Sequence, residues 1–188
     1  MLDIKTTSLS DVLILYPRRF GDDRGWFCET WNEKRMSEHG LDFGFVQDNH
    51  SFSADVGTLR GLHYQAPPRA QDKLVRCSQG AIRDVVVDAR LGSPTFGEWV
   101  TIDISAKDGR QILVPKGFLH GFVTTAPNTE VQYKVTDFYD ADCDGSVAWD
   151  SLDIDWKLDG SEPILSDKDT AAPTFSDWVS PFHYEKSS

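Results

Sequence analysis

The sequence predicts an all-β fold, an antiparallel sandwich or barrel, in a single domain that spans residues 1–188. Short segments rich in β-branched and aromatic residues recur about every ten residues and are separated by glycine-containing turns, which is typical of such folds. The chain also has no internal repeat, no low-complexity tract and no linker rich in proline, glycine or serine that would divide it.

The first predicted strands lie in the N-terminal half of the chain. Residues 12–16 form an apolar run of strand length. Residues 73–77 and 81–88 are both β candidates, and they flank the short segment 78–80, which ends in glycine. A glycine-containing link of this length between two such runs predicts a β-hairpin.

The later strands follow the same pattern. Residues 98–105 place β-branched apolar residues at every second position, which is the period of a half-buried strand. An Asp-Gly turn at 108–109 leads into the apolar segment 111–114. Residues 130–139 are rich in valine, tyrosine, threonine and phenylalanine, so they predict another strand.

Helices contribute little to the predicted fold. One helix is expected from Asn32 to His39, because Gly40 follows as a C-terminal stop. A second, weaker helix is expected near the C-terminus.

Composition and charge limit the partners and the compartment. The formal net charge is -11, from 30 acidic and 19 basic residues, and such a surface repels nucleic acid and anionic membranes. No apolar run approaches the roughly 20 residues of a membrane span, and residues 1–5 do not resemble a signal peptide. The three cysteines are odd in number and widely spaced, so we expect buried free thiols and a cytoplasmic location.

Two motifs resemble the paired motifs of the cupin superfamily, whose barrels hold a metal at their mouth. The matching residues are Gly57, His63 and Gly80 in the first motif, with Lys73 at the motif's spacing before Gly80, and Pro115, Gly117 and His120 in the second. Gln65 stands where cupins have a second histidine, and Lys73 stands where they have glutamate. Because an amide is a poor ligand and an ammonium repels a cation, we expect no metal at this site.

Further motifs make the chain similar to the dTDP-4-dehydrorhamnose 3,5-epimerase family. The matching segments follow the family's order over about residues 5 to 175, and they are 21–25, 47–51, 61–65, 73–76, 133–139 and 165–169. The resemblance implies a double-stranded β-helix (jelly-roll) barrel with short flanking helices, no cofactor and a homodimer. It also implies conversion of dTDP-4-dehydro-6-deoxy-D-glucose to dTDP-4-dehydro-L-rhamnose.

The resemblance also implies four catalytic residues. His63 is expected to be the base, and Asp169 is expected to accept a hydrogen bond from the other nitrogen of its ring. Lys73 is expected to stabilise the enolate that forms next to the C4 ketone. Tyr133 is expected to return a proton to the opposite face of the sugar.

The same resemblance implies a set of substrate-binding residues. Arg24 and Arg60 are expected at the diphosphate, and Tyr139 is expected to stack on thymine. Asp144 departs from the glutamate expected there, and Lys168 replaces an arginine found in some members. The full expected set is Arg24, Glu29, Gln47, Asn49, Arg60, Lys73, His120, Tyr139, Asp144 and Lys168.

Several alternatives remain open at this point. A mono-epimerase or a ketoisomerase would share the barrel, the base and the nucleotide pocket. A non-catalytic carbohydrate-binding cupin would not need His63 with Asp169, and a metal-dependent oxygenase is disfavoured by Gln65 and Lys73. Residues 140–145 resemble half of a calcium-binding loop, but Ser151 stands where that loop needs a glutamate, so a solvated acidic turn is expected.

Overall fold

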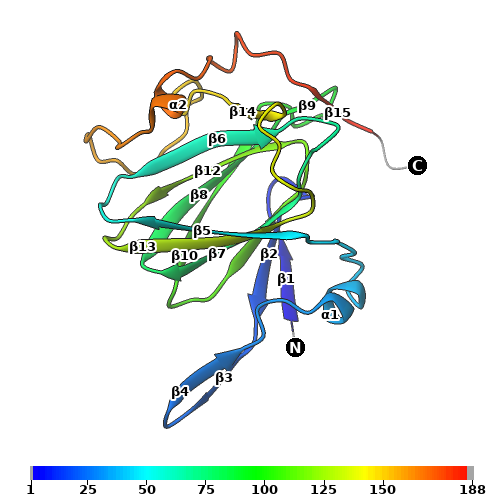
Figure 1. The fold of residues 1–188 in the computed structure, drawn as a ribbon, viewed down its shortest axis with the longest axis vertical. Coiled ribbons are helices and arrows are strands. Elements are labelled where there is room, and N and C mark those ends of the chain that lie inside the picture. The colour runs from blue at the N-terminus through cyan, green and yellow to red at the C-terminus, as the bar shows by residue number, and fades with distance from the viewer. Residues whose placement is uncertain (1, 186–188) are drawn as a thin grey trace.

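The computed structural model describes residues 2–185, and two facing β-sheets form most of the molecule (Figure 1). Neighbouring strands in both sheets are antiparallel, and the chain crosses repeatedly between them, which makes a jelly-roll barrel. The six-stranded sheet has the order β1 (Leu2–Thr6), β2 (Leu13–Pro17), β11 (Gln111–Val114), β7 (Lys73–Gln79), β13 (Thr129–Val135), β5 (Gln47–Ser53). The five-stranded sheet has the order β10 (Trp99–Ser105), β8 (Ala81–Asp88), β12 (Phe118–Thr124), β6 (Leu59–Gln65), β14 (Asp144–Ser146).

The remaining elements are short. Strand β3 (Arg19–Asp22) pairs with β4 (Gly25–Cys28) in a separate hairpin, and β9 (Arg90–Leu91) pairs in parallel with β15 (Phe182–His183). The helices α1 (Glu33–Ser37) and α2 (Asp167–Thr170) flank the barrel. Neither is long and apolar enough to cross a membrane, and within residues 2–185 there is no other α-helix.

The main core lies between the two sheets. Val75 and Val131 contribute from the six-stranded sheet, whereas Ile82 and Val86 contribute from the five-stranded sheet. All four are at most 1% exposed, and full burial of such a side chain stabilises a fold by about 1.5–3 kcal/mol. The alternation of side chains along each strand therefore distinguishes an inner face, toward this core, from an outer face.

The predicted hairpin of 73–77 and 81–88 is wrong. Both strands exist, but β7 belongs to the six-stranded sheet and β8 to the five-stranded sheet, so they do not pair. Gly80 between them has φ of 75°, and a Cβ there would lie 2.2 Å from Oγ1 of Thr129. The turn therefore carries the chain across the barrel rather than back along the same sheet.

Other predictions hold with changed ends. The helix expected at 32–39 is shorter, because Asn32 is the N-cap that accepts a hydrogen bond from the Arg35 backbone and the helix ends at Ser37. The strand expected at 130–139 ends at Val135, and the next residues turn into a loop.

The expectation of three buried thiols is only partly right. Cys77 is buried, whereas Cys28 and Cys143 are partly exposed because they lie near the ends of short surface strands. All three are free.

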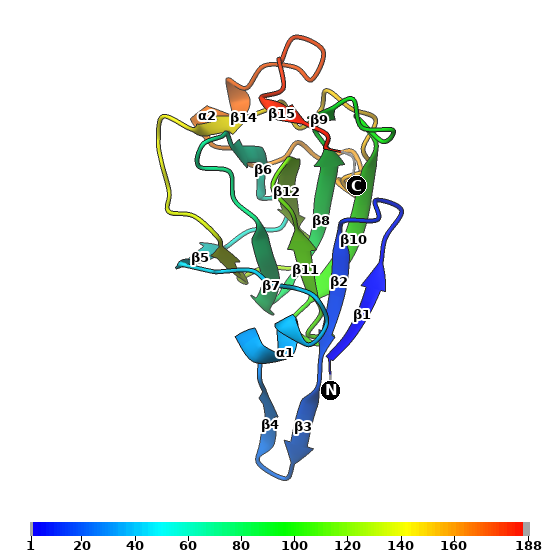
Figure 2. The same ribbon diagram turned by 90° about the vertical axis from the view of Figure 1, so that its right-hand side faces the viewer.

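The β3–β4 hairpin projects away from the barrel (Figures 1 and 2). Its aromatic side chains Phe20, Trp26 and Phe27 are exposed. Exposed aromatic side chains gathered on one hairpin form an unusual apolar surface. A two-stranded hairpin is also only marginally stable in water by itself.

Candidate active site

The six-stranded sheet presents a group of polar side chains on its inner face. Asn49 and Val75 are the register partners of Tyr133 on either side. Since partners in adjacent strands point to the same face, and Val75 belongs to the core between the sheets, Asn49 and Tyr133 also face inward. Gln47 and Lys73 are placed two residues from Asn49 and Val75 along their strands, so they face the same way.

The five-stranded sheet also carries polar side chains on its inner face. Asp84 lies between the core residues Ile82 and Val86 on β8, at positions that alternate toward the inner face. His120 is the register partner of His63 across β12 and β6, so both rings share one face. The side chains from both sheets therefore meet in the interior of the barrel.

Two glycines allow the histidine strands to approach closely. A Cβ on Gly61 would lie 2.6 Å from the Cα of Gly121 on the neighbouring strand, a distance that no real side chain tolerates. Gly61 also has φ of 140°, which favours glycine. The backbone around His63 and His120 thus depends on the absence of a side chain at both positions.

His63 and Asp169 form a hydrogen-bonded pair. The Nε2 atom of His63 lies 2.5 Å from Oδ1 of Asp169, and the two side chains are 30% and 3% exposed. Ser166, the N-cap of α2, donates from its hydroxyl to Oδ2 of Asp169 at 2.8 Å. The carboxylate is therefore fixed from two sides, and it orients the imidazole ring.

The charge state of Asp169 suits this role. Burial raises the pKa of Asp169, but the hydrogen bonds from His63 and Ser166 and the Lys168 ammonium outweigh burial, so its pKa lies below the ordinary value. The carboxylate remains anionic near neutral pH and can stabilise a positively charged His63 ring.

Asp84 is a site residue that the sequence analysis missed. It is completely buried, and its Oδ2 accepts from Nε2 of His120 at 2.9 Å. Its Oδ1 has no hydrogen-bond partner within the described part of the chain. Burial raises the pKa of Asp84, although His120 and Lys73 lower it. An aspartate at the same alternate positions as Ile82 and Val86 in the segment 81–88 was the available signal.

Lys73 lies close to several charges. Burial lowers the pKa of Lys73 to about 8, and Lys168 lowers it as well, whereas Asp144 and Asp84 raise it. A lysine held near this value is still mostly protonated at neutral pH, so it can place a positive charge in the barrel interior.

Tyr133 faces the interior from the opposite sheet to His63. Burial raises its pKa above the ordinary tyrosine value, Asp144 raises it further, and Arg60 lowers it. The phenol is therefore protonated at neutral pH and can donate a proton. Its ring packs against the core between the sheets.

Other expected binding residues gather at the same end of the barrel. The ammonium of Lys168 on α2 donates to Oδ2 of Asp144, and the hydroxyl of Tyr139 donates to the same oxygen at 3.3 Å. The side-chain amide of Gln47 donates to Oδ1 of Asn49 at 2.9 Å, while its oxygen accepts from the backbone N–H of Tyr139 at 3.1 Å. Loop and strand residues are thus connected into one network.

Arg60 also belongs to this group. It is the register partner of Phe122, whose ring is in the core between the sheets, so its side chain starts on the inner face. The guanidinium donates to the backbone oxygen of Phe52 at 3.2 Å and to the hydroxyl of Ser53 at 3.4 Å. These contacts leave it able to bind an anion.

Two expected residues are not brought to the site by this single chain. Arg24 is at the tip of the β3–β4 hairpin, where its side chain is 89% exposed and pairs with Asp22. Glu29 follows β4 and pairs with Arg35 of α1 at 3.1 Å. Arg24 therefore lies on the projecting hairpin, and Glu29 lies beside α1, which flanks the barrel.

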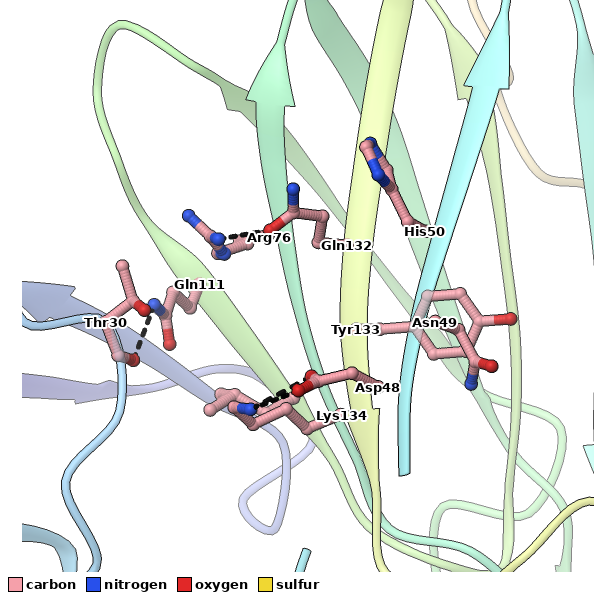
Figure 3. Close-up of a pocket in the computed structure, with 10 residues that line it drawn as sticks. Thr30, Asp48, Asn49, His50, Arg76, Gln111, Gln132, Tyr133 and Lys134 are labelled. Carbon is pink, nitrogen blue, oxygen red and sulfur yellow. Dashed lines mark hydrogen bonds and ion pairs between the residues drawn. The ribbon is translucent and has the colours of Figure 1, made fainter. Parts of the chain in front are cut away.

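A separate pocket of about 280 Å³ lies on the outer side of the six-stranded sheet (Figure 3). Arg76 and Gln132, which are hydrogen-bonded to each other, line its floor, and Lys134 pairs with Asp48 at its edge. Gln111 is buried beside it, and its Oε1 has no partner within the described residues. The catalytic residues expected from sequence, apart from Tyr133, do not line this pocket.

Two of the side chains at the cupin metal positions, an amide and an ammonium, are poor metal ligands. Within residues 2–185, no group of three or more histidine, cysteine or acidic side chains is arranged to hold an ion. Gln65, at one former ligand position, donates to backbone oxygens instead. Lys73, at the other, supplies a cation.

Comparison with known proteins gives a consistent result. A protein family described as dTDP-4-dehydrorhamnose 3,5-epimerase matches residues 6–177. The dTDP-4-dehydrorhamnose 3,5-epimerase of Sinorhizobium fredii is 45% identical over 185 residues, which cover 97% of this chain and 94% of that protein.

Solved structures of the same family are also similar to this chain. A crystal structure of dTDP-4-dehydrorhamnose 3,5-epimerase from Bacillus anthracis, with TDP and PPi bound, is 49% identical, has a TM-score of 0.90, and covers 93% of this chain and 100% of that chain. A dTDP-6-deoxy-D-glucose-3,5-epimerase from Legionella pneumophila, in complex with dTDP-4-keto-L-rhamnose, is 40% identical, has a TM-score of 0.93, and covers 98% of this chain and 100% of that chain.

Proposed function

Since the chain belongs to the dTDP-4-dehydrorhamnose 3,5-epimerase family, we propose how its own residues carry out that reaction. The enzyme converts dTDP-4-dehydro-6-deoxy-D-glucose to dTDP-4-dehydro-L-rhamnose by inverting C3 and C5. Both carbons lie next to the C4 ketone, so removal of either proton leaves an enolate. Inversion then requires a base on one face of the ring and an acid on the other.

His63 and Tyr133 are the proposed base and acid. The observation that carries this assignment is their placement: His63 enters the interior from the five-stranded sheet, and Tyr133 enters it from the six-stranded sheet that faces it. The free nitrogen of His63 takes the proton, the electron pair of the C–H bond forms the C=C bond of the enolate, and the π pair of the ketone moves onto its oxygen. The phenol of Tyr133 then delivers its proton to the carbon from the other side.

Two further residues stabilise the charges that develop. The negative charge on the C4 oxygen is proposed to be stabilised by the ammonium of Lys73, which is close to Asp84 and Asp144 and therefore cationic at neutral pH. The positive charge on His63 is proposed to be stabilised by Asp169, whose anionic form is favoured by its hydrogen bonds.

Nucleotide binding is proposed for the surrounding residues. Arg60 is placed to contact the diphosphate, because its side chain extends from the inner face of β6, the strand that also carries the proposed catalytic base His63. The exposed ring of Tyr139 is available to stack on thymine, and Gln47 with Asn49 offers amides at the same edge. His120, Asp144 and Lys168 complete the proposed set.

Deuterium incorporation tests the reaction and its number of steps. The 4-keto sugar nucleotide is incubated with the protein in D2O, and the label is located by NMR. Deuterium at both C3 and C5 with inverted product supports the double epimerase, whereas label at one carbon only supports a mono-epimerase. Unlabelled and unchanged substrate would overturn catalysis and favour a binding module.

We further propose that the enzyme acts as a homodimer in which each copy completes the other's site. Arg24 is far from the barrel interior of its own chain, at the tip of a projecting hairpin. The exposed aromatic side chains of the same hairpin, Trp26 and Phe27, favour contact with a second molecule. A partner that covers these rings could receive Arg24 at its own diphosphate site.

Subunit mixing tests this arrangement. Arg24→Ala and His63→Ala variants are each expected to have little activity alone. If Arg24 acts in the partner's site, a mixed dimer contains one intact site, and random mixing restores about a quarter of wild-type activity. No recovery in a sample whose mixed dimers are verified by mass would place Arg24 in its own chain's site.

The cytoplasm is the proposed compartment. The free thiols of Cys28, Cys77 and Cys143 support a reducing environment. Recovery of the native protein with cytoplasmic markers after cell fractionation tests it.

A further inference from the structure

Gln65, at a position where cupins have a metal ligand, uses its whole side-chain amide in hydrogen bonds. Its side chain is 5% exposed and lies on β6, two residues after His63. The Nε2 group donates to the backbone oxygens of Arg69 and Phe138, the latter at 3.0 Å, and Oε1 accepts from the backbone N–H of Asp140 at 3.0 Å. Both amide hydrogens and the amide oxygen are therefore used.

Two of these contacts flank Tyr139. The backbone oxygen of Phe138 and the backbone N–H of Asp140 belong to the residues on either side of it, and both bind Gln65. The backbone N–H of Tyr139 itself donates to Gln47. The backbone of this three-residue segment is thus held by two glutamine side chains, one from each sheet.

The ring of Tyr139 has little other support. It is 60% exposed, and its hydroxyl makes a long hydrogen bond of 3.3 Å to Asp144. Because the ring is not enclosed by core side chains, its direction depends on the backbone that carries it. That backbone is connected through Gln65 to the same strand that carries the base.

We propose that Gln65 is a positioning residue for nucleotide binding, which holds the segment 138–140 so that the Tyr139 ring is already oriented to stack on the base. The inference rests on the proposed function, since it takes Tyr139 to be the base-binding aromatic. Gln65 does not itself touch the reacting atoms. It fixes the distance between the nucleotide end of the site and the catalytic end.

The physical consequence is a loss of preorganisation when Gln65 is removed. Without its hydrogen bonds the segment 138–140 gains conformational freedom, which must be lost again when the nucleotide binds. Substrate that is already bound still meets His63 and Tyr133 in place. Affinity should therefore fall while the rate at saturation changes little.

Gln65→Met tests this inference, because methionine preserves length and is uncharged but lacks the amide. Relative to wild type, the Kd for dTDP by calorimetry and the KM for the sugar nucleotide should both rise about 3- to 10-fold. The kcat should remain within about twofold. Gln79→Met is the matched control, since Gln79 also donates to a backbone oxygen, that of Asn128, but away from this segment. It should bind dTDP as wild type does.

A double-mutant cycle decides whether Gln65 acts through Tyr139. Tyr139→Ala alone should weaken dTDP binding, and Gln65→Met combined with Tyr139→Ala should weaken it little further. Additive losses, or a kcat that falls as much as the affinity, would overturn the inference. If Gln65→Met does not fold, the cycle is run with Gln65→Glu, which retains the acceptor for Asp140 but lacks both donors.

The outcome also separates this inference from the proposed function. Wild-type dTDP affinity in Tyr139→Ala would refute the base-binding role of Tyr139 and the positioning role of Gln65 with it. Weakened binding in Tyr139→Ala with unchanged binding in Gln65→Met would refute only the positioning role.

Discussion

His63 and His120 lie opposite each other on adjacent antiparallel strands, and each is hydrogen-bonded through Nε2 to a carboxylate of its own. The two pairs differ in exposure. The ring of His63 is 30% exposed, whereas that of His120 is 8% exposed and its partner Asp84 is completely buried. The accessible pair suits proton transfer with substrate, and the buried pair suits orientation of the site.

Asp84, the carboxylate of the buried pair, also raises the pKa of Lys73, and this leads to a prediction for the pH dependence of catalysis. The proposed role of Lys73 requires its charged form, and burial lowers the pKa of Lys73 to about 8, so kcat/KM should fall as pH rises through that value. The groups that face Lys73 are Asp84 from β8, Asp144 from β14 and Lys168 from α2, with His120 beyond Asp84. Asp84→Asn removes a charge that raises this pKa, so the fall should begin at lower pH.

The pH profile of kcat/KM for Asp84→Asn is the measurement. Asp153→Asn is the control, because it removes the same charge from an exposed position. An unshifted limb in Asp84→Asn would show that Lys73 does not depend on this carboxylate.

His63 and Tyr133 should be separable by exchange and inversion. His63→Ala should lose both exchange of substrate protons with D2O and epimerisation, because the enolate no longer forms. Tyr133→Phe should still exchange a proton from the His63 side but form little inverted product. NMR of the C3 and C5 protons measures both rates. Equal losses of exchange and inversion in Tyr133→Phe would mean that Tyr133 acts before the enolate forms.

Asp169 should affect the rate through His63. Asp169→Asn leaves a side chain of the same shape but removes the charge that favours the imidazolium, so kcat should fall about 100- to 10,000-fold. Ser166→Ala removes one hydrogen bond to this carboxylate and the N-cap of α2, and it should cost about 1 kcal/mol of stability. Kinetics and thermal unfolding measure the two effects. A kcat for Asp169→Asn near that of wild type would contradict the assignment.

Arg60 should contribute to anion binding rather than to folding. Arg60→Ala should weaken binding of dTDP by about 1.5–3 kcal/mol, the range for hydrogen bonds to charged groups. Arg110→Ala is a control, because Arg110 pairs with Asp108 in a turn outside the barrel interior. Calorimetry measures both. Wild-type affinity in Arg60→Ala would place the diphosphate elsewhere.

Activity should not require a metal ion. Gln65 and Lys73 occupy two positions that would bind a metal in a cupin, and both make other interactions. Extended dialysis against a chelator should leave kcat unchanged. Stoichiometric metal in elemental analysis, with activity lost on chelation and restored by that metal, would contradict this prediction.

Much of the fold could be predicted because side-chain alternation is local. The strands at 98–105 and 111–114 appear nearly as expected. The first buries Ile102 and Ile104 at every second position, whereas all four residues of the second are buried. The motifs around His63 and His120 were also visible, since glycine and histidine at fixed spacing are sequence features.

Sequence alone supplied the proposed chemistry of the site, because its resemblance to the family assigns His63, Lys73 and Tyr133 as base, cation and acid. Tertiary structure decided which residues support them. Alternation shows that a residue faces one side of a strand, but it does not show which distant strand lies opposite. For this reason Asp84 became visible as the partner of His120 only once β8 and β12 were placed side by side in one sheet. Gln65 became visible as the support of Tyr139 only once the loop after β13 was placed beside β6. The same limit explains why β7 and β8 were expected to pair although the turn at Gly80 sends them to different sheets.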